Sequence, residues 1–407
     1  MTNKEFNTFV LPNGIRCLHK KISSPVAYCA LTINAGSRDE LPSEHGLAHF
    51  VEHSMFKGTK NRTSYEILNF IESKGGEVNA YTGKEETVLH AVCLNSDVEC
   101  AVDIISDLVF NATFLQSKID QEKQVIYDEQ NSYVDSYPES IYDDFEDLLF
   151  KNSSLGHNIL GTKRRLKKFT SEDLINFVSR CYTTDQMVFS MFSNMDFEIF
   201  KSMSEKYFAH QEKTTRSFER TATLKYNKFN KKENKGEAQV HYFMGNRAFS
   251  LEDKLRLPAS LMTNMLGGQS INSLLNVALR EEQGLTYNIE ASITPFCDSG
   301  IFSIYFTCDK KNLSKSTELV KQQIQKMSDR DFIENILPSA KTQFKGQIRI
   351  AQESQENYML NAARSYLIYN DIDPVEVMMQ KIDEITTEQM LEVAERLFTN
   401  YSTLIYK

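Results

Sequence analysis

The sequence predicts an α+β fold of two duplicated domains, each an antiparallel-rich mixed sheet with helices packed on one face. At 407 residues the chain is too long for one ordinary hydrophobic core, so two domains are expected. The predicted strands pair as meanders rather than through crossover helices, and the same order of elements occurs twice. We place the first domain at residues 1–212, a polar linker at 213–236 and the second domain at 237–407.

The first domain opens with a predicted β-hairpin, because two apolar runs flank the turn sequence Pro12-Asn13-Gly14. A later helix is expected to end at Gly75-Gly76, since glycine readily adopts the left-handed conformation that ends a helix. Apolar periodicity predicts strands at 9–11, 15–18, 26–33, 77–82 and 87–94, and helices at 46–56, 64–74, 96–110 and from 117 past 129.

The second domain repeats this order. A strand is predicted at 239–244, helices at 251–266 and 271–283, and paired strands at 287–293 and 301–307. In both halves the last strand of the pair leads into a helix, after Cys93 in the first and after Cys308 in the second. An internal duplication explains this most simply. Periodicity fades between the halves, where the basic stretch from Lys225 to Lys235 is predicted to be a solvated linker.

Composition excludes several classes of function. The net charge of -9 argues against nucleic-acid binding, which needs a basic surface to neutralise phosphates. No apolar run is long enough for a signal peptide or a membrane span, so we expect no membrane partner and a cytoplasmic protein. The seven cysteines form no CxxC pair, which argues against a disulfide framework and against a cysteine zinc site.

The chemistry is concentrated in the segment His45-Gly-Leu-Ala-His49-Phe-Val-Glu52-His53, which holds three of the eight histidines. On a helix, His49, Glu52 and His53 lie within an arc of about 100°, and the apolar residues lie on the other side. Two histidines four residues apart can bind one zinc ion, which lowers the pKa of a bound water molecule toward about 7. Glu52 precedes the second histidine and is predicted to be the general base that takes the proton of that water. Histidines that merely face solvent are the alternative.

A third ligand is needed, and carboxylates are available downstream. Glu122 and Glu129 are seven residues apart on a predicted helix, so they share a face, and Val125 and Ile126 lie between them. Carboxylates aligned with an apolar stripe are predicted to point inward, where a charge is costly unless it is paired or binds a metal. A structural salt bridge would satisfy the same pattern, but the histidine helix offers a better partner.

With further segments in a fixed order, these residues resemble the inverzincins, the pitrilysin and insulysin peptidases, and above all the branch of mitochondrial processing peptidase and its short bacterial relatives. The resemblance covers nearly the whole chain. It is carried by Gly46 to Thr59, Gly75-Gly76 with Asn79 to Thr82, the two glutamates above, and Arg280 to Tyr287.

The resemblance implies specific roles in the first domain. One Zn²⁺ per chain would be held by His49, His53 and Glu129, with Glu52 as the base. Glu122 would orient a ligand histidine through a hydrogen bond. An edge strand would bind the substrate main chain as an added strand, which tolerates many side-chain sequences. The residues of that strand are Asn79, Ala80, Tyr81 and Thr82.

The resemblance also implies that the metal-free second domain contributes Arg280 and Tyr287 to the substrate and to the transition state. Read without it, these residues would be a surface arginine and a strand tyrosine. Some relatives divide the zinc ligands and the Arg/Tyr pair between two different chains, whereas this chain carries both. A homodimer whose domains enclose a chamber is therefore the expected assembly.

Together these expectations describe a zinc-dependent metalloendopeptidase that hydrolyses unfolded peptides or oligopeptides inside an enclosed dimer chamber. Two alternatives stay open. One is a dedicated presequence-processing peptidase. The other is a non-catalytic scaffold or core subunit of the same fold, in which degenerate ligands would be expected, whereas His49, Glu52, His53 and Glu129 are all present.

Overall fold

The computed structural model describes residues 5–223 and 227–407, which divide into two compact units. Unit 1 contains the described residues up to Asn131, together with 158–220 and 350–374. Unit 2 contains 132–157, the described part of 221–349, and 375–407. Each unit therefore includes a segment from the other half of the sequence, so the compact units differ from the contiguous ranges 1–212 and 237–407.

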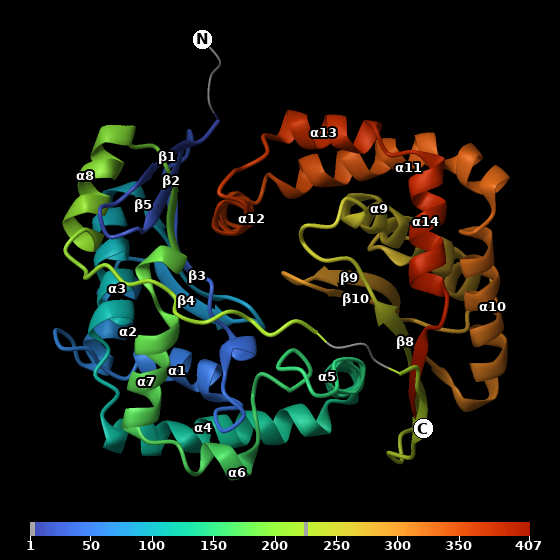
Figure 1. Cartoon of the computed structure of the whole chain (residues 1–407), viewed down its shortest axis with the longest axis horizontal. Helices are drawn as coiled ribbons and strands as arrows, with labels where there is room; N and C mark the ends of the chain where they lie inside the picture. The colour runs from blue at the N-terminus through green and yellow to red at the C-terminus, as the bar shows by residue number, and fades with distance from the viewer. Residues whose placement is uncertain (1–4, 224–226) are drawn as a thin grey trace. The chain divides into compact units, whose positions relative to one another are not determined.

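Unit 1 is built on a mixed sheet with the strand order β1-β2-β6-β3-β5-β4 (Figure 1). The strands are β1 Asn7–Val10, β2 Arg16–Lys21, β3 Val26–Ile33, β4 Glu77–Thr82, β5 Thr87–Leu94 and β6 Met187–Ser193. β2 pairs with β6 in parallel and the other neighbours are antiparallel, so the predicted antiparallel-rich sheet is confirmed. β4 lies at one edge of the sheet, and its outer side has no strand partner among the described residues.

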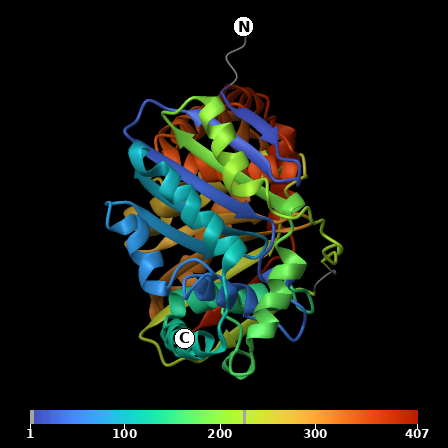
Figure 2. The ribbon, with the colours of Figure 1, turned by 90° about the vertical axis from the view of Figure 1, so that its left-hand side faces the viewer.

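One face of this sheet carries the four helices that the apolar periodicity predicted, α1 to α4, and three that it did not predict, α6 to α8 (Figure 2). They are α1 Leu47–Met55, α2 Ser64–Glu72, α3 Val98–Asn111, α4 Gln116–Asp135, α6 Lys163–Leu166, α7 Ser171–Cys181 and α8 Phe197–Phe208. Their buried residues form one core with the inward side chains of the strands, such as Cys29 and Leu31 of β3. Short 3-10 helices join elements of both units: η1 Ser37–Asp39, η2 Asn95–Asp97, η3 Thr184–Gln186 and η5 Lys310–Asn312.

The opposite face of the sheet is covered by α12, Gln355–Tyr369, which comes from the C-terminal half of the chain (Figure 1). Met359 and Ala363 of α12 pack with Ala30 and Val188 in a second core. The prediction of helices on one face was incomplete, because it did not recognise that the outward strand residues are also apolar and need cover.

Polar contacts fix the two ends of α12. The guanidinium group of Arg16 donates to the carbonyl oxygens of Tyr366 and Leu367 at 3.0 and 2.8 Å. These carbonyls belong to the last turn of the helix, and that of Tyr366 also accepts from the backbone N–H of Asn370. Near the other end, Nδ1 of His90 lies 2.6 Å from Oε1 of Glu356. Together these bonds fasten α12 to β2 and β5.

Unit 2 has a second mixed sheet, with the order β7-β11-β8-β10-β9. The strands are β7 Asn230–Glu233, β8 Gln239–Arg247, β9 Ile289–Pro295, β10 Gly300–Asp309 and β11 Ser402–Tyr406. β7 lies inside the predicted linker, so the linker assignment was wrong for these residues. This polar strand is held by main-chain hydrogen bonds to β11. The pattern of its side chains therefore could not predict it. Lys225, at the start of the basic stretch, lies outside the described residues.

Helices also cover both faces of the second sheet. One face carries α9 Arg256–Gly267, α10 Leu313–Lys326, α11 Arg330–Ala351, α13 Val375–Asp383 and α14 Thr387–Phe398. The predicted helix at 271–283 is mostly replaced by a π-helix, η4, at Asn276–Glu281. The other face is covered by α5, Tyr137–Leu149, from the N-terminal half, through Phe145 packed on Phe243. None of the helices in the described ranges is both long and apolar enough to cross a membrane.

Because α12 comes from the C-terminal half of the chain but packs in unit 1, a mutation late in the sequence should destabilise unit 1. Met359→Ala removes a fully buried side chain and should cost about 2–5 kcal/mol of unfolding free energy. Hydrogen exchange should accelerate in β3 and β6 and stay unchanged in β8 and β10. Ile350→Ala, at a position that is 74% exposed, is the control and should change little. Faster exchange confined to unit 2 would contradict the assignment.

Candidate metal centre

The helix that carries the predicted histidines, α1, is anchored at its N-terminus by a buried carboxylate. Glu40 accepts hydrogen bonds from the backbone N–H groups of Gly46 at 3.1 Å and of Ala48 at 2.8 Å. These are among the N–H groups that have no partner within a helix. Burial raises the pKa of Glu40, and the backbone hydrogen bonds oppose that shift. Glu40 thus fixes the start of α1.

The polar face of α1 is itself inside the protein. His49 and Glu52 are each only 9% exposed, while Leu47, Phe50 and Val51 pack into the core of unit 1. Burial, and then the neighbouring His53, lower the pKa of His49 to about 3. The imidazole is therefore neutral at physiological pH, which is the form that binds metals.

The second histidine, His53, is oriented by a carboxylate of α4. Nδ1 of His53 lies 2.9 Å from Oε1 of Glu122, and Nζ of Lys57 lies 2.7 Å from the other carboxylate oxygen. Burial opposes ionisation of Glu122, but the hydrogen bonds to His53 and Lys57 outweigh it and lower its pKa. With Nδ1 engaged in this way, Nε2 of His53 is directed to the other side of the ring.

The structure brings three predicted ligands together. The closest ligand atoms of His49, His53 and Glu129 lie within 4.8 Å of one another. Nε2 of His49 is 3.7 Å from Oε1 of Glu129, and Nε2 of His53 is 3.8 Å from Oε2. These separations are too long for hydrogen bonds.

The same separations suit a cation. Two ligands of a tetrahedral zinc at about 2.0–2.1 Å lie about 3.3–3.4 Å apart, slightly closer than the observed distances. Oε2 of Glu129 is also buried and has no hydrogen-bond partner among the described residues. Two imidazoles and one carboxylate, of which one oxygen has no partner, therefore fit a zinc ion.

Glu52 lies beside this cluster and contacts the edge strand. Its Oε2 accepts a hydrogen bond of 2.9 Å from Oγ1 of Thr82 in β4. Burial raises the pKa of Glu52, and the hydrogen bond from Thr82 and the charge of His53 only partly oppose this. A carboxylate with a raised pKa is a better proton acceptor, which suits a general base at neutral pH.

The edge strand β4 has alternate backbone groups directed away from the sheet. The turn that joins β4 to β5 contains a hydrogen bond from the N–H of Gly83 to the carbonyl of Glu86, which defines the pairing in the antiparallel ladder. By that alternation, Val78, Ala80 and Thr82 direct their N–H and C=O groups to the open side. Asn79 and Tyr81 direct theirs to β5.

Arg280 and Tyr287 lie together in unit 2. Both line a pocket of about 310 Å³, along with Gly267, Gly268 and residues of β9. Tyr287 is 90% exposed, and the guanidinium group of Arg280 is 3.6 Å from the carboxylate of Glu281. The zinc ligands belong to unit 1, so the contact of this pair with the substrate stays a prediction.

The sequence did not identify the roles of Glu40 and Lys57. Glu40 bonds to the backbone at the start of α1 from an irregular segment, and Lys57 bonds to Glu122, which is distant in the sequence. Hydrophobic periodicity contains no signal for either contact. The inward stripe on α4 was also partly wrong, because Val125 is 49% exposed while Ile126 and Glu122 are buried. The turn of α4 places Ile119 and Ile126, rather than Val125, against the core.

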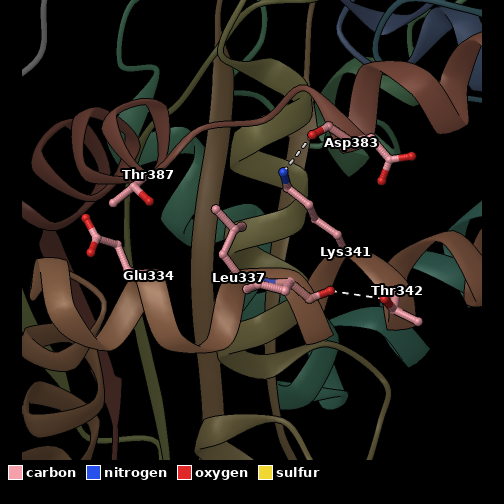
Figure 3. A pocket seen from close by; sticks show the side chains of 7 residues that line it. Glu334, Leu337, Lys341, Thr342, Asp383 and Thr387 are labelled. Atoms are coloured by element: carbon pink, nitrogen blue, oxygen red, sulfur yellow. Dashed lines mark hydrogen bonds between the residues drawn. The ribbon is translucent and has the colours of Figure 1, made fainter.

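A separate pocket in unit 2, of about 420 Å³, lies between α11 and the segments around Asp383 and Thr387 (Figure 3). Nζ of Lys341 donates to the backbone carbonyl of Asp383 at 2.8 Å, and Oγ1 of Thr342 donates to the carbonyl of Pro338 at 3.0 Å. The second bond runs back one turn within α11. These contacts are those of a junction between helices, and the lining residues include no histidine.

Comparison with known families identifies the family of this chain. Residues 17–163 match the family described as Insulinase (Peptidase family M16), and residues 168–344 match the Peptidase M16 inactive domain. The chain belongs to peptidase family M16. The first M16 match contains the histidines and both glutamates of the cluster, and the second contains Arg280 and Tyr287. The resemblance seen in the sequence is confirmed.

Relatives that match nearly the whole chain are described as zinc proteases. An uncharacterized zinc protease of Rickettsia bellii is 29% identical over 401 residues, covering 98% of this chain and 97% of the relative. The uncharacterized zinc protease YmxG of Bacillus subtilis is 27% identical, covering 96% and 95%. A protease from Helicobacter pylori has a similar structure, with a TM-score of 0.87, 18% identity and 99% of both chains covered. This last likeness supports the M16 fold.

The contacts of Glu122 predict its effect on metal binding. Glu122→Gln should weaken zinc binding about 10–100-fold, because a neutral amide cannot replace the carboxylate between His53 and Lys57. Competition with a chelating dye measures the affinity. Asp128→Asn is the matched control, since it removes one negative charge next to Glu129 from an exposed position of α4. Equal affinities for both variants would exclude an orienting role of Glu122.

Proposed function

We propose that this M16 chain is a zinc metalloendopeptidase that hydrolyses unfolded peptides or oligopeptides. The observation that carries the proposal is the convergence of two histidines and a carboxylate beside a fourth ionisable group, Glu52, which is hydrogen-bonded to an open edge strand. Metal binding alone would need only the ligands. The buried base and the adjacent strand edge provide for a proton transfer and for an extended polypeptide.

The edge strand supports a main-chain mode of substrate binding. An extended peptide would add to β4 through the outward N–H and C=O groups of Ala80 and Thr82, with Asn79 and Tyr81 as the intervening positions. It would replace the side-chain oxygen of Asn79, which accepts from the Ala80 N–H at 2.8 Å. Since Thr82 is bonded to Glu52, a peptide on this edge would pass close to the base. Backbone hydrogen bonds are the same for most residues, so broad sequence tolerance is expected.

In this proposal His49, His53 and Glu129 would hold the zinc ion, which would supply Lewis-acid activation of water and of the scissile carbonyl. Glu52 accepts a proton from the attacking water and delivers it to the nitrogen of the leaving amine. Thr82 orients the Glu52 carboxylate by donating to one of its oxygens. Glu122 keeps the His53 ring in place during these steps.

Arg280 and Tyr287 are proposed to donate hydrogen bonds to the substrate as negative charge develops on the carbonyl oxygen. A guanidinium and a phenol both donate without being deprotonated. The exposure of Tyr287 leaves its hydroxyl group available for a ligand. Because this chain carries both the ligands and this pair, a homodimer enclosing a chamber is the proposed assembly; light scattering tests it.

Cleavage of a mixed peptide library, analysed by mass spectrometry with and without a chelator, tests the proposal. Many chelator-sensitive cleavage sites would support a general oligopeptidase. Cleavage restricted to targeting presequences would instead identify a dedicated processing peptidase. No cleavage by zinc-loaded protein would favour the non-catalytic scaffold.

Glu52→Gln should separate metal binding from turnover. The amide cannot accept the proton, so kcat should fall at least about 10²–10⁴-fold while the zinc content stays near one per chain. His49→Ala and Glu129→Ala should lose both zinc and activity. Peptide cleavage and metal analysis of the same preparations measure the two effects. Near wild-type turnover in the Glu52→Gln protein would exclude Glu52 as the base.

Tyr287→Phe should lower kcat about 10²–10³-fold without loss of zinc, since it removes one donor to the developing oxyanion. Arg280→Ala should in addition raise KM, because it also removes a substrate contact. Tyr65→Phe is the matched control, because Tyr65 is an exposed tyrosine in α2. An unchanged kcat in Tyr287→Phe would show that unit 2 supplies no donor through this residue.

A further inference from the structure

Glu129, the third predicted ligand, lies close to the point where α4 leaves unit 1. Unit 1 includes α4 only as far as Asn131, and residues 132–157 belong to unit 2 before the chain returns at Asn158. The ligand is thus two residues from a boundary between compact units. The two histidines, in contrast, lie on a helix that is wholly inside unit 1. Contacts within unit 1 must therefore keep the end of α4 in register with α1.

The returning segment supplies these contacts on the side of α4. Gln130 follows the ligand directly, is only 5% exposed, and donates from Nε2 to the carbonyl oxygen of Leu160 at 2.7 Å. The hydroxyl of Tyr127 donates to the carbonyl of Lys163 at 3.4 Å, and Nζ of Lys163 donates to Oδ1 of Asn131. The last turn of α4 in unit 1 is consequently bonded to residues 160–163.

The same segment touches the start of α1. Gly161 has a φ of 64°, and a Cβ atom there would lie 2.3 Å from the carbonyl oxygen of His45 and 2.6 Å from Cα of Gly46. Gly46, with a φ of 98°, is the residue before α1 and is held on its other side by Glu40. The two backbones are in direct contact, and no side chain fits between them.

We propose that Gln130 and Gly161 are positioning residues that set the distance between the two ligand-bearing helices. α1 and α4 are bonded directly through His53 and Glu122, about two turns before Glu129. The path from the histidines through Gly46, Gly161, Leu160 and Gln130 is a second link, which acts at the end of α4 that carries Glu129. This clamp holds the carboxylate next to Nε2 of His49 even though α4 continues into unit 2. The inference rests on the proposed zinc site.

The hydrogen bond is tested by Gln130→Met, which removes the donor and keeps most of the volume. Gln124→Met is the matched control, because Gln124 lies on the solvent side of α4 and bonds only to Asp128 among the contacts described. Gln130→Met should weaken zinc binding about 10–100-fold and lower kcat with little change in KM. The control should retain wild-type values.

The backbone contact is tested by Gly161→Ala with Gly75→Ala as its control. Both positions have positive φ, so both substitutions carry the same kind of backbone strain. A Cβ at Gly75 would meet no atom within 4 Å, whereas one at Gly161 would meet the backbone before α1. Only Gly161→Ala should weaken zinc binding and alter the visible absorption of the cobalt-substituted protein, which reports the geometry of the ligands.

Hydrogen exchange of the metal-free protein separates the clamp from the zinc proposal. In Gln130→Met, amides of 127–131 and 158–163 should exchange faster than in Gln124→Met. Unchanged exchange, or a lower melting temperature with unchanged zinc affinity and cobalt spectrum, would overturn the clamp. A wild-type protein that binds no zinc would refute the proposed function, and the exchange result would still decide whether the clamp exists.

Discussion

The cluster of His49, Glu52, His53 and Glu129 brings four ionisable groups together and removes two of them, His49 and Glu52, almost completely from water. Many contacts of unit 1 compensate for this cost. Removing such groups from water is costly unless each has a partner. His53 has Glu122, Glu122 also has Lys57, and Glu52 has Thr82. The neutral His49 lies 3.7 Å from Oε1 of Glu129, and the unpartnered Oε2 of the same carboxylate lies 3.8 Å from Nε2 of His53, so a cation between them would satisfy all three groups.

The contacts around the cluster divide into those that hold side chains and those that hold helices. Glu122 and Thr82 act on single side chains. Glu40, Gly46 and Gly161 act on the backbone at the start of α1. A metal site needs both, since a correctly oriented imidazole is of no use if its helix can shift relative to the other ligand.

Each of the two units is completed by a helix from the other half of the chain. α12 covers a face of the sheet in unit 1, and α5 covers a face of the sheet in unit 2, so neither sheet is completed by its own half of the chain. A fragment that ends near residue 212 would leave Ala30 and Val188 without the cover of α12. Such a fragment would not report the behaviour of an intact zinc-bearing unit.

The sequence by itself determined the local chemistry and most of the elements. The spacing of His49, Glu52 and His53 on a helix needs no knowledge of distant residues, because it follows from the helical repeat. β3, β4 and β5 were predicted with the bounds that the structure has, since alternation and turn residues are also local signals. Glu129 could be proposed as a partner, since a carboxylate beside an apolar stripe is an unusual local pattern.

Tertiary structure alone decided the contacts that no local pattern encodes. Three such contacts join residues far apart in the sequence. They are the packing of α5 and α12 on the sheet of the other half, the pairing of β7 with β11, and the approach of Gly161 to Gly46. Each depends on which surface remains uncovered after the rest has folded. Periodicity shows that a strand face or a helix face is apolar, but the element that covers it is selected by packing over the whole chain.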